Sequence, residues 1–133
     1  MSTFDADKIM NASQGLGIND VVELTGISAF TIRYYDKCGF FPNLIRGKRG
    51  VRTFTEHDVY QLRLVDALRR SGLSIEGIRY FVRLSIRGDG SLDDRRQIIQ
   101  TQTTALEYQI AEAEESLALL RAELESLKSQ NSE

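Results

Sequence analysis

A regular apolar repeat fills the last third of this chain and constrains its fold more than any other feature. From Ile99 to Leu127 the repeat positions are separated alternately by four and three residues. Such a 3.5-residue period, kept over about four heptads, is typical of a coiled coil. The repeat consists of Ile99, Thr103, Leu106, Ile110, Ala113, Leu117, Leu120, Leu124 and Leu127. We therefore expect one helix over residues 91–129, whose stretch from Leu92 to Leu127 is about 50 Å long at about 1.5 Å per residue.

The repeat predicts a homodimer, because the preceding part of the chain is too small to cover so long and narrow a stripe. The expected dimer contacts are Leu106, Ile110, Ala113, Leu117, Leu120, Leu124 and Leu127. Charges beside the stripe favour an antiparallel pair. In that orientation Glu107 meets Lys128 of the partner subunit, and Glu114 meets Arg121 of the partner subunit. The same register stacks Ile110 on Leu127 and Leu117 on Leu120.

Charge is divided unevenly along the sequence. Residues 28–87 carry twelve Lys and Arg against five acids, whereas residues 91–133 carry four against nine. A basic block joined to an acidic helix is expected when one part touches nucleic acid and the other does not. Two ordinary charged surfaces are the alternative explanation.

Turn and capping residues divide the basic block into elements. Residues 1–16 lack periodicity and are expected to form a flexible arm, followed by a domain over residues 17–88. A short amphipathic helix over residues 19–24 ends at Gly26, which is free to adopt positive φ. Ser28 then caps a second helix that ends near Lys37. Two short helices joined by so tight a turn form a helix-turn-helix.

The next segment predicts a basic β-hairpin, or wing. Apolar and β-branched patches flank the tip Gly47-Lys48-Arg49-Gly50 within residues 40–54. Thr55 and Asp58 then form a capping box that opens a third helix, and Ser74 caps a fourth. A loop over residues 88–90 precedes the long helix, and residues 130–133 are expected to form a disordered tail. The fold class is mainly α.

Several spaced motifs carry a family resemblance. They are Ser28-x-x-Thr31-Ile32-Arg33-Tyr34-Tyr35-Asp36-x-x-Gly39-Phe40, Arg52-Thr53-Phe54-Thr55-x-x-Asp58, and Leu68-Arg69-x-x-Gly72-Leu73-Ser74-Ile75-Glu76-x-Ile78. Their types and order resemble the MerR family of bacterial transcription regulators. The resemblance covers residues 18–87 by motif and residues 91–128 by architecture. It implies a homodimer that binds a palindromic promoter element and distorts its spacer until RNA polymerase can initiate.

The resemblance and the chemistry of the side chains give candidate DNA contacts. In a helix-turn-helix the start of the second helix faces base edges. Arg33 and Thr31 suit base or phosphate contacts, and Phe30 suits a thymine methyl group. The family places phosphate contacts at Tyr34 and Tyr35, although Tyr35 is alternatively a core aromatic. The full set is Ser28, Phe30, Thr31, Arg33, Tyr34, Tyr35, Arg46, Lys48, Arg49, Arg52 and Ser74, where Ser74 is equally well a plain helix cap.

Other functions have little support in the residues. One Cys and one His without ligand spacing give no metal site, and we expect no cofactor and no enzymatic activity. Cys38 is interpreted as buried filler, with a redox switch as the alternative. No apolar run suits a membrane and no secretory signal is visible, so a cytoplasmic location is expected. An architectural or recombination-accessory DNA-binding protein is the competing function, and a small-molecule effector stays unknown.

Overall fold

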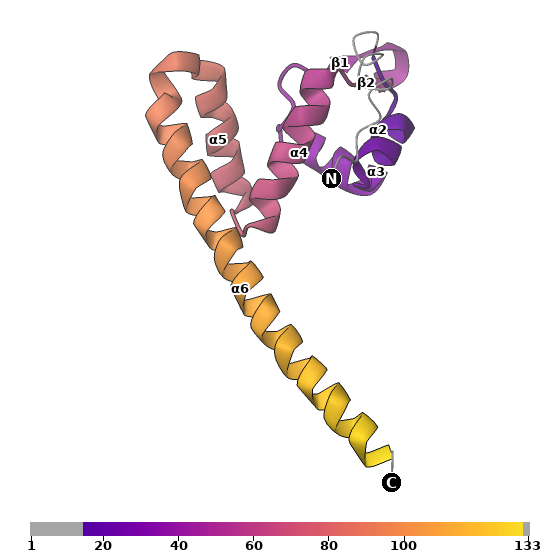
Figure 1. The fold of residues 1–133 in the computed structure, drawn as a ribbon. Helices are drawn as coiled ribbons and strands as arrows, with labels where there is room; N and C mark the ends of the chain where they lie inside the picture. Colours follow the sequence, from indigo (N-terminus) through magenta and orange to yellow (C-terminus); the bar gives the residue numbers. More distant parts are fainter. Residues whose placement is uncertain (1–14, 132–133) are drawn as a thin grey trace.

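The computed structural model describes residues 15–131, and these residues form a small helical body from which one long helix extends (Figure 1). The predicted arm lies outside the described residues apart from Gly15 and Leu16, as does the end of the predicted tail. The elements in chain order are α2 (Ile18–Thr25), α3 (Ala29–Lys37), β1 (Ile45–Arg46), the 3-10 turn Lys48–Gly50, β2 (Arg52–Thr53), α4 (Glu56–Arg70), α5 (Ile75–Arg87), the 3-10 turn Gly88–Ser91 and α6 (Leu92–Asn131). The predicted fold class, mainly α with a two-stranded wing and a long C-terminal helix, is confirmed.

Local capping signals set the boundaries of the helix-turn-helix. The Gly17 amide donates to the Asp20 carboxylate at 3.2 Å, which stabilises the first turn of α2. Gly26 ends that helix in the left-handed conformation with φ of 74°. The Ser28 hydroxyl accepts from the Thr31 amide at 3.1 Å and begins α3. Both helices form where the capping residues predict them.

The wing is a short antiparallel hairpin, with Ile45 opposite Thr53 and Arg46 opposite Arg52. Its tip turns at Arg49, which adopts a positive φ of 62°. The sequence prediction for Leu16 needs correction at this point, because this residue was assigned to the flexible arm. Leu16 is buried and exchanges two 2.8 Å backbone hydrogen bonds with Phe54. The backbone at Leu16 thus extends the small sheet beyond β2.

Helices α4 and α5 bring the wing and the helix-turn-helix onto one core. Thr55 and Asp58 form the predicted capping box, in which the Thr55 amide donates to the Asp58 carboxylate at 2.9 Å. Completely buried side chains come from α2, α3, α4 and α5 and from the segments that follow α3 and β2: Val21, Ile32, Phe40, Phe54, Val59, Leu62, Val65 and Ile78. Each large side chain contributes roughly 1.5–3 kcal/mol by leaving water. This core fixes the position of α3 relative to the wing.

The long helix α6 has two different parts. Its first turns pack on α4 and α5, where Ile99 and Leu106 lie beside Leu64 and Leu68. Its C-terminal part projects away from the body (Figure 1), and the repeat residues Ile110, Leu117, Leu120, Leu124 and Leu127 are 44–67% exposed. Leu106 was predicted as a dimer contact, yet it is half-buried against its own chain. The helix also continues to Asn131, into the segment predicted as a tail.

Candidate nucleic-acid interface

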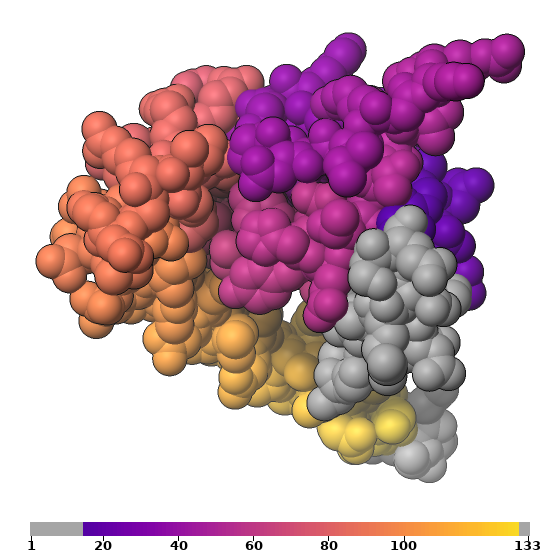
Figure 2. All heavy atoms as spheres, turned by 90° about the horizontal axis from the view of Figure 1, so that it is seen from above, coloured from indigo at the N-terminus to yellow at the C-terminus, as the bar shows by residue number. Residues whose placement is uncertain are grey.

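One side of α3 is exposed and chemically suited to nucleic acid. Phe30, Arg33, Tyr34 and Lys37 follow each other at helical spacing, so they share one face. Phe30 is 80% exposed and Tyr34 is 44% exposed, so both aromatic rings face solvent in the single chain. Arg52 of the wing joins these four around a shallow depression. We call these five residues the reading face. Figure 2 shows the wing projecting from the body beside the segment that contains α3.

The reading face includes one residue that the sequence prediction omitted. Lys37 stands seven residues after Phe30, two turns further along the same face of α3. That spacing was visible in the sequence, but the residue was counted only as part of the basic block.

Ser28 and Thr31 lie at the start of α3, beside the reading face. The Ser28 hydroxyl donates to the Thr31 hydroxyl oxygen at 3.0 Å while it caps the helix. With this bond the Thr31 hydroxyl keeps its own hydrogen to donate to another acceptor. This geometry suits the contact predicted for Thr31.

Tyr35 lies on the opposite face of α3, and its predicted phosphate contact conflicts with its position. The residue is 4% exposed, its ring packs on Phe40, and its hydroxyl donates to Asp66 at 3.0 Å. Burial, with a smaller effect of Asp66, raises the pKa of Tyr35 to about 12, so the hydroxyl stays a donor. Adjacent helical residues point about 100° apart, so α3 exposes Tyr34 and buries Tyr35. The alternative assignment of Tyr35 as a core aromatic is the correct one.

A buried carboxylate attaches the wing to α3. Asp36 accepts hydrogen bonds from both terminal nitrogens of Arg46, at 2.8 and 2.5 Å, and from Arg52 Nε at 2.6 Å. Burial alone raises the pKa of Asp36, but the two guanidinium groups outweigh it and hold the pKa below 3.8. Arg46 and Arg52 were predicted solely as DNA contacts. Their side chains, 48% and 25% exposed, first hold the hairpin in place and present only their remaining N–H groups outward.

Replacing Asp36 by Asn is expected to loosen the wing. The amide keeps the shape but loses the charge that two arginines share, so the free energy of unfolding falls by about 2 kcal/mol. Denaturant titration measures this loss. Because the two guanidinium groups hold the folded-state pKa of Asp36 below its ordinary value, the stabilisation is present at pH values well above the unfolded-state pKa and is lost as the pH falls through the folded-state pKa. A wild-type protein that lost the same stability between pH 6 and 5 would contradict this assignment.

Ser74 lies at the start of α5, and Cys38 lies at the end of α3. The Ser74 hydroxyl accepts from the Gly77 amide at 3.0 Å, so it caps α5, and its exposure leaves the predicted phosphate contact open. Arg79 Nε donates to the Cys38 carbonyl at 2.9 Å and ties α5 to the end of α3. Cys38 itself is 7% exposed. A buried thiol of this kind suits the packing interpretation and not the redox alternative.

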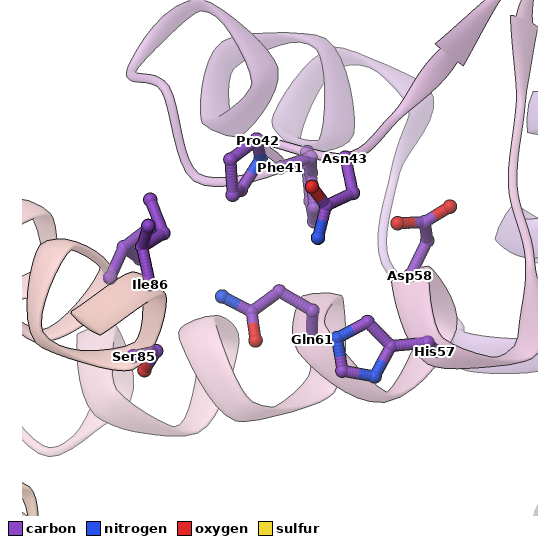
Figure 3. Close-up of a pocket in the computed structure, with 9 residues that line it drawn as sticks. Phe41, Pro42, Asn43, His57, Asp58, Gln61, Ser85 and Ile86 are labelled. Carbon is purple, nitrogen blue, oxygen red and sulfur yellow. The ribbon is translucent and has the colours of Figure 1, made fainter. Parts of the chain in front are cut away.

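The side chains of α4 and α5 also line a cavity of about 100 Å³ beside the loop that follows α3 (Figure 3). Its lining includes His57, Asp58, Gln61 and Ser85. Asp58 belongs to the capping box, Gln61 donates to the Phe40 carbonyl at 3.3 Å and Ser85 donates to the Phe81 carbonyl at 3.1 Å. Typical ligand pockets are about 300–1,000 Å³. The cavity is small, and three of its polar side chains already serve the fold.

Comparison with known families identifies the exposed helix and the wing as parts of one known arrangement. Residues 16–84 match the family described as MerR HTH family regulatory protein. The chain belongs to the MerR family. It is 39% identical over 102 residues to an uncharacterized HTH-type transcriptional regulator of Haemophilus influenzae, and the match covers 77% of this chain and 76% of that protein.

Solved MerR-family structures share the same fold. One is HiNmlR, a MerR-family regulator lacking the sensor domain, bound to promoter DNA; it is 36% identical, with a TM-score of 0.71 over 83% of this chain and 87% of that one. A MerR-family transcriptional regulator from Bacillus thuringiensis is 28% identical, with a TM-score of 0.74 over 83% and 96%. The resemblance inferred from the motifs is therefore confirmed, and this chain is a MerR-family transcriptional regulator.

The family consists of DNA-binding transcription regulators. Within residues 15–131 no helix is both long and apolar enough to cross a membrane. Over the same range, His, Cys, Asp and Glu side chains form no cluster of three that could hold a metal ion.

Proposed function

We propose that this MerR-family regulator acts as an antiparallel homodimer that binds a palindromic promoter element and reshapes the DNA between the half-sites, so that RNA polymerase can initiate. The apolar stripe on the projecting part of α6 carries this proposal. Five large apolar side chains, Ile110, Leu117, Leu120, Leu124 and Leu127, are 44–67% exposed there. Exposed apolar surface arranged in one line marks an association site.

A second copy of the chain fits the stripe best. The heptad spacing matches the packing of one helix on an identical one. In the antiparallel register, Leu117 stacks on Leu120 of the partner subunit, and both charge pairs beside the stripe are attractive. Burying each stripe residue contributes roughly 1.5–3 kcal/mol, so ten side chains per dimer outweigh the cost of association.

Each reading face is proposed to occupy one half-site in the major groove. Arg33 suits guanine and Phe30 suits a thymine methyl group, while Ser28 and Thr31 lie at the helix start that approaches the bases. Tyr34 and Lys37 suit phosphates. Five further residues are proposed to contact the DNA phosphate backbone. They are Arg46 and Arg52 through their outward N–H groups, Lys48 and Arg49 at the wing tip, and Ser74 at the start of α5.

DNA distortion follows from the rigidity of the dimer. A coiled coil and a packed core fix the distance between two reading faces, so a spacer of another length or twist has to adapt. Promoter DNA bound to the similar regulator HiNmlR supports a promoter as the target. The reshaped spacer then allows RNA polymerase to bind the promoter and initiate transcription.

Selection of binding sites from a random DNA library, using the full chain, tests this function. We expect enriched palindromes, a dimer by light scattering, and affinity that falls as salt rises with a log–log slope of about −0.9 per phosphate contact. In vitro transcription from a promoter that carries the selected site should then change. DNA bending without any effect on transcription would favour an architectural role, and the absence of enriched sites would refute the proposal.

The antiparallel register makes a separate prediction. Replacing Glu107 and Glu114 by Lys places like charges opposite Lys128 and Arg121 of the partner subunit, so the dimer dissociation constant should rise about tenfold at low salt. Adding Arg121→Glu and Lys128→Glu to the same chain should restore dimerisation. Sedimentation equilibrium measures both effects. If the Glu→Lys substitutions leave the dissociation constant unchanged, or if the added Glu residues do not restore dimerisation, the dimer has another register.

A further inference from the structure

The junction between the DNA-binding body and α6 contains a polar cluster around the buried Ser71, with Gln102 half-buried and Gln109 exposed. Ser71 follows the last residue of α4 and is 4% exposed. Gln102 Nε2 donates to the Ser71 hydroxyl at 2.7 Å, and Gln109 Nε2 donates to the Ser71 carbonyl at 3.2 Å. The Ser71 hydroxyl in turn donates to the Leu68 carbonyl at 2.6 Å. We call Ser71, Gln102 and Gln109 the clamp.

Both glutamines belong to the long helix and are placed for a common task. They stand seven residues apart, two turns of α6, so they share one face. Each directly precedes a repeat position, Thr103 or Ile110, so the clamp face adjoins the proposed dimer stripe. The last carbonyls of a helix lack partners within that helix, and Gln109 supplies one for α4. The two helices are thereby connected at a defined point, which Figure 1 shows where the α4–α5 turn meets α6.

Apolar packing around the clamp is incomplete. Leu64, Leu68, Ile99 and Leu106 border a hollow of about 100 Å³ that opens to the surface between α4 and α6. Apolar contacts have no preferred direction, whereas hydrogen bonds weaken steeply when they are misaligned. In a loosely packed seam, the hydrogen bonds of the clamp therefore define the angle between the two helices.

The angle between α4 and α6 controls the position of the wing and of α3 relative to the long helix. Helix α4 has 15 residues and joins the clamp at one end to the wing at the other. At about 1.5 Å per residue it is about 22 Å long, so a tilt of about 10° at the clamp moves the far end by about 4 Å. One base pair of B-DNA rises about 3.4 Å. A small change at the clamp is thus comparable to a one-base-pair change in half-site separation.

We propose that Gln102 and Gln109 are positioning residues that, by holding Ser71, set the half-site separation this regulator accepts. The inference rests on the proposed dimeric function. Neither glutamine belongs to the reading face or occupies a repeat position, so their replacement leaves the proposed DNA contacts and the apolar residues of the repeat in place. The two glutamines affect the distance between the two reading faces of the dimer, and they do not change the contacts that each reading face makes with its half-site.

The test uses the full chain with Gln102→Met and Gln109→Met, which keep the side-chain length and remove the donors. Gln97→Met and Gln100→Met, at exposed positions of the same helix, form the matched control. Affinity is measured on the selected palindrome with its half-sites moved apart or together in single-base-pair steps, and on an isolated half-site. Thermal unfolding and light scattering accompany each variant.

For the wild type and the control we expect at least a tenfold loss of affinity one base pair from the optimum. In the clamp variant this preference should fall below threefold, or the optimum should move, with half-site affinity within threefold of wild type. An unchanged spacing profile overturns the inference, as does a variant whose half-site and palindrome affinities fall by the same factor. If the double variant does not fold, Gln109→Met alone decides by the same criteria. A wild-type chain that shows no dimer or no palindrome refutes the proposed function itself.

Discussion

Replacing Leu117 and Leu120 by Asp is expected to turn the regulator into a monomer and to lower its operator affinity by about 10²–10⁴-fold. In the antiparallel register these residues form the central layers, Leu117 against Leu120 of the partner subunit and the reverse. Both side chains are exposed in the single chain, at 44% and 67%, so the change costs its fold little. In the dimer it would bury four carboxylates without partners, a cost that no remaining layer offsets.

DNA affinity falls because a monomer no longer carries two connected reading faces. Two reading faces joined by a rigid coil bind the second half-site as an intramolecular step, which commonly adds 10²–10⁴ to the affinity. Ala118→Asp with Ala122→Asp is the matched control, because these residues occupy the same turns of α6 outside the stripe. Light scattering measures the oligomeric state of both variants. Fluorescence anisotropy measures their affinities for the operator and for a half-site. A dimeric Leu117/Leu120 variant would rule out the proposed interface.

Local signals explain which parts of the fold were predictable. Gly26, Ser28, Thr55 and Ser74 act within three or four residues of themselves, and each helix boundary they imply is observed. The heptad repeat of α6 is likewise a property of one helix. The helix-turn-helix, the wing and the long helix could therefore be predicted by spacing alone.

Contacts between distant residues were not predictable in this way. Asp36 meets Arg46 and Arg52, ten and sixteen residues away, so the sequence showed basic wing residues but not their internal partner. Tyr34 and Tyr35 have the same chemistry, and only the position of the core decides which one is exposed. Their different roles depend on how α3 rotates against α4, which no local pattern encodes.

The seam between α4 and α6 illustrates the same limit. Gln102 and Gln109 lie 31 and 38 residues from Ser71. In the sequence they look like ordinary polar positions of a coiled coil. The repeat also marked Leu106 as a dimer residue, because a heptad pattern does not distinguish packing on another chain from packing on the same one. Leu106 therefore packs at least in part on its own chain.

Replacing Arg33 by Ala is expected to produce the largest loss of sequence-specific affinity for any single substitution. Arg33 is exposed in the middle of the reading face, between Phe30 and Lys37. A bidentate contact from Arg to guanine is worth roughly 1–3 kcal/mol. A homodimer presents the residue twice, so the loss should reach roughly 2–6 kcal/mol, about 30-fold to more than 10⁴-fold.

Two control substitutions distinguish base reading from general attraction. Lys37→Ala should weaken binding to all sequences alike and make the salt slope shallower by about 2, one phosphate per subunit. Tyr35→Phe removes a hydroxyl that points at Asp66 inside the core, so it should lower stability and leave DNA affinity nearly unchanged. Anisotropy titrations on the selected operator and on a copy with its conserved guanines replaced measure all three.

The decisive quantity for Arg33→Ala is the ratio of its affinity for the selected operator to its affinity for the operator with replaced guanines. If Arg33 reads guanine, the variant binds both operators almost equally, because the altered operator has already lost the partner of the side chain. If Arg33 only neutralises phosphate, the variant keeps the wild-type ratio and resembles Lys37→Ala. The second result would move base recognition to the other candidates near the start of α3, which are the exposed Ser28 and Phe30 and the half-buried Thr31.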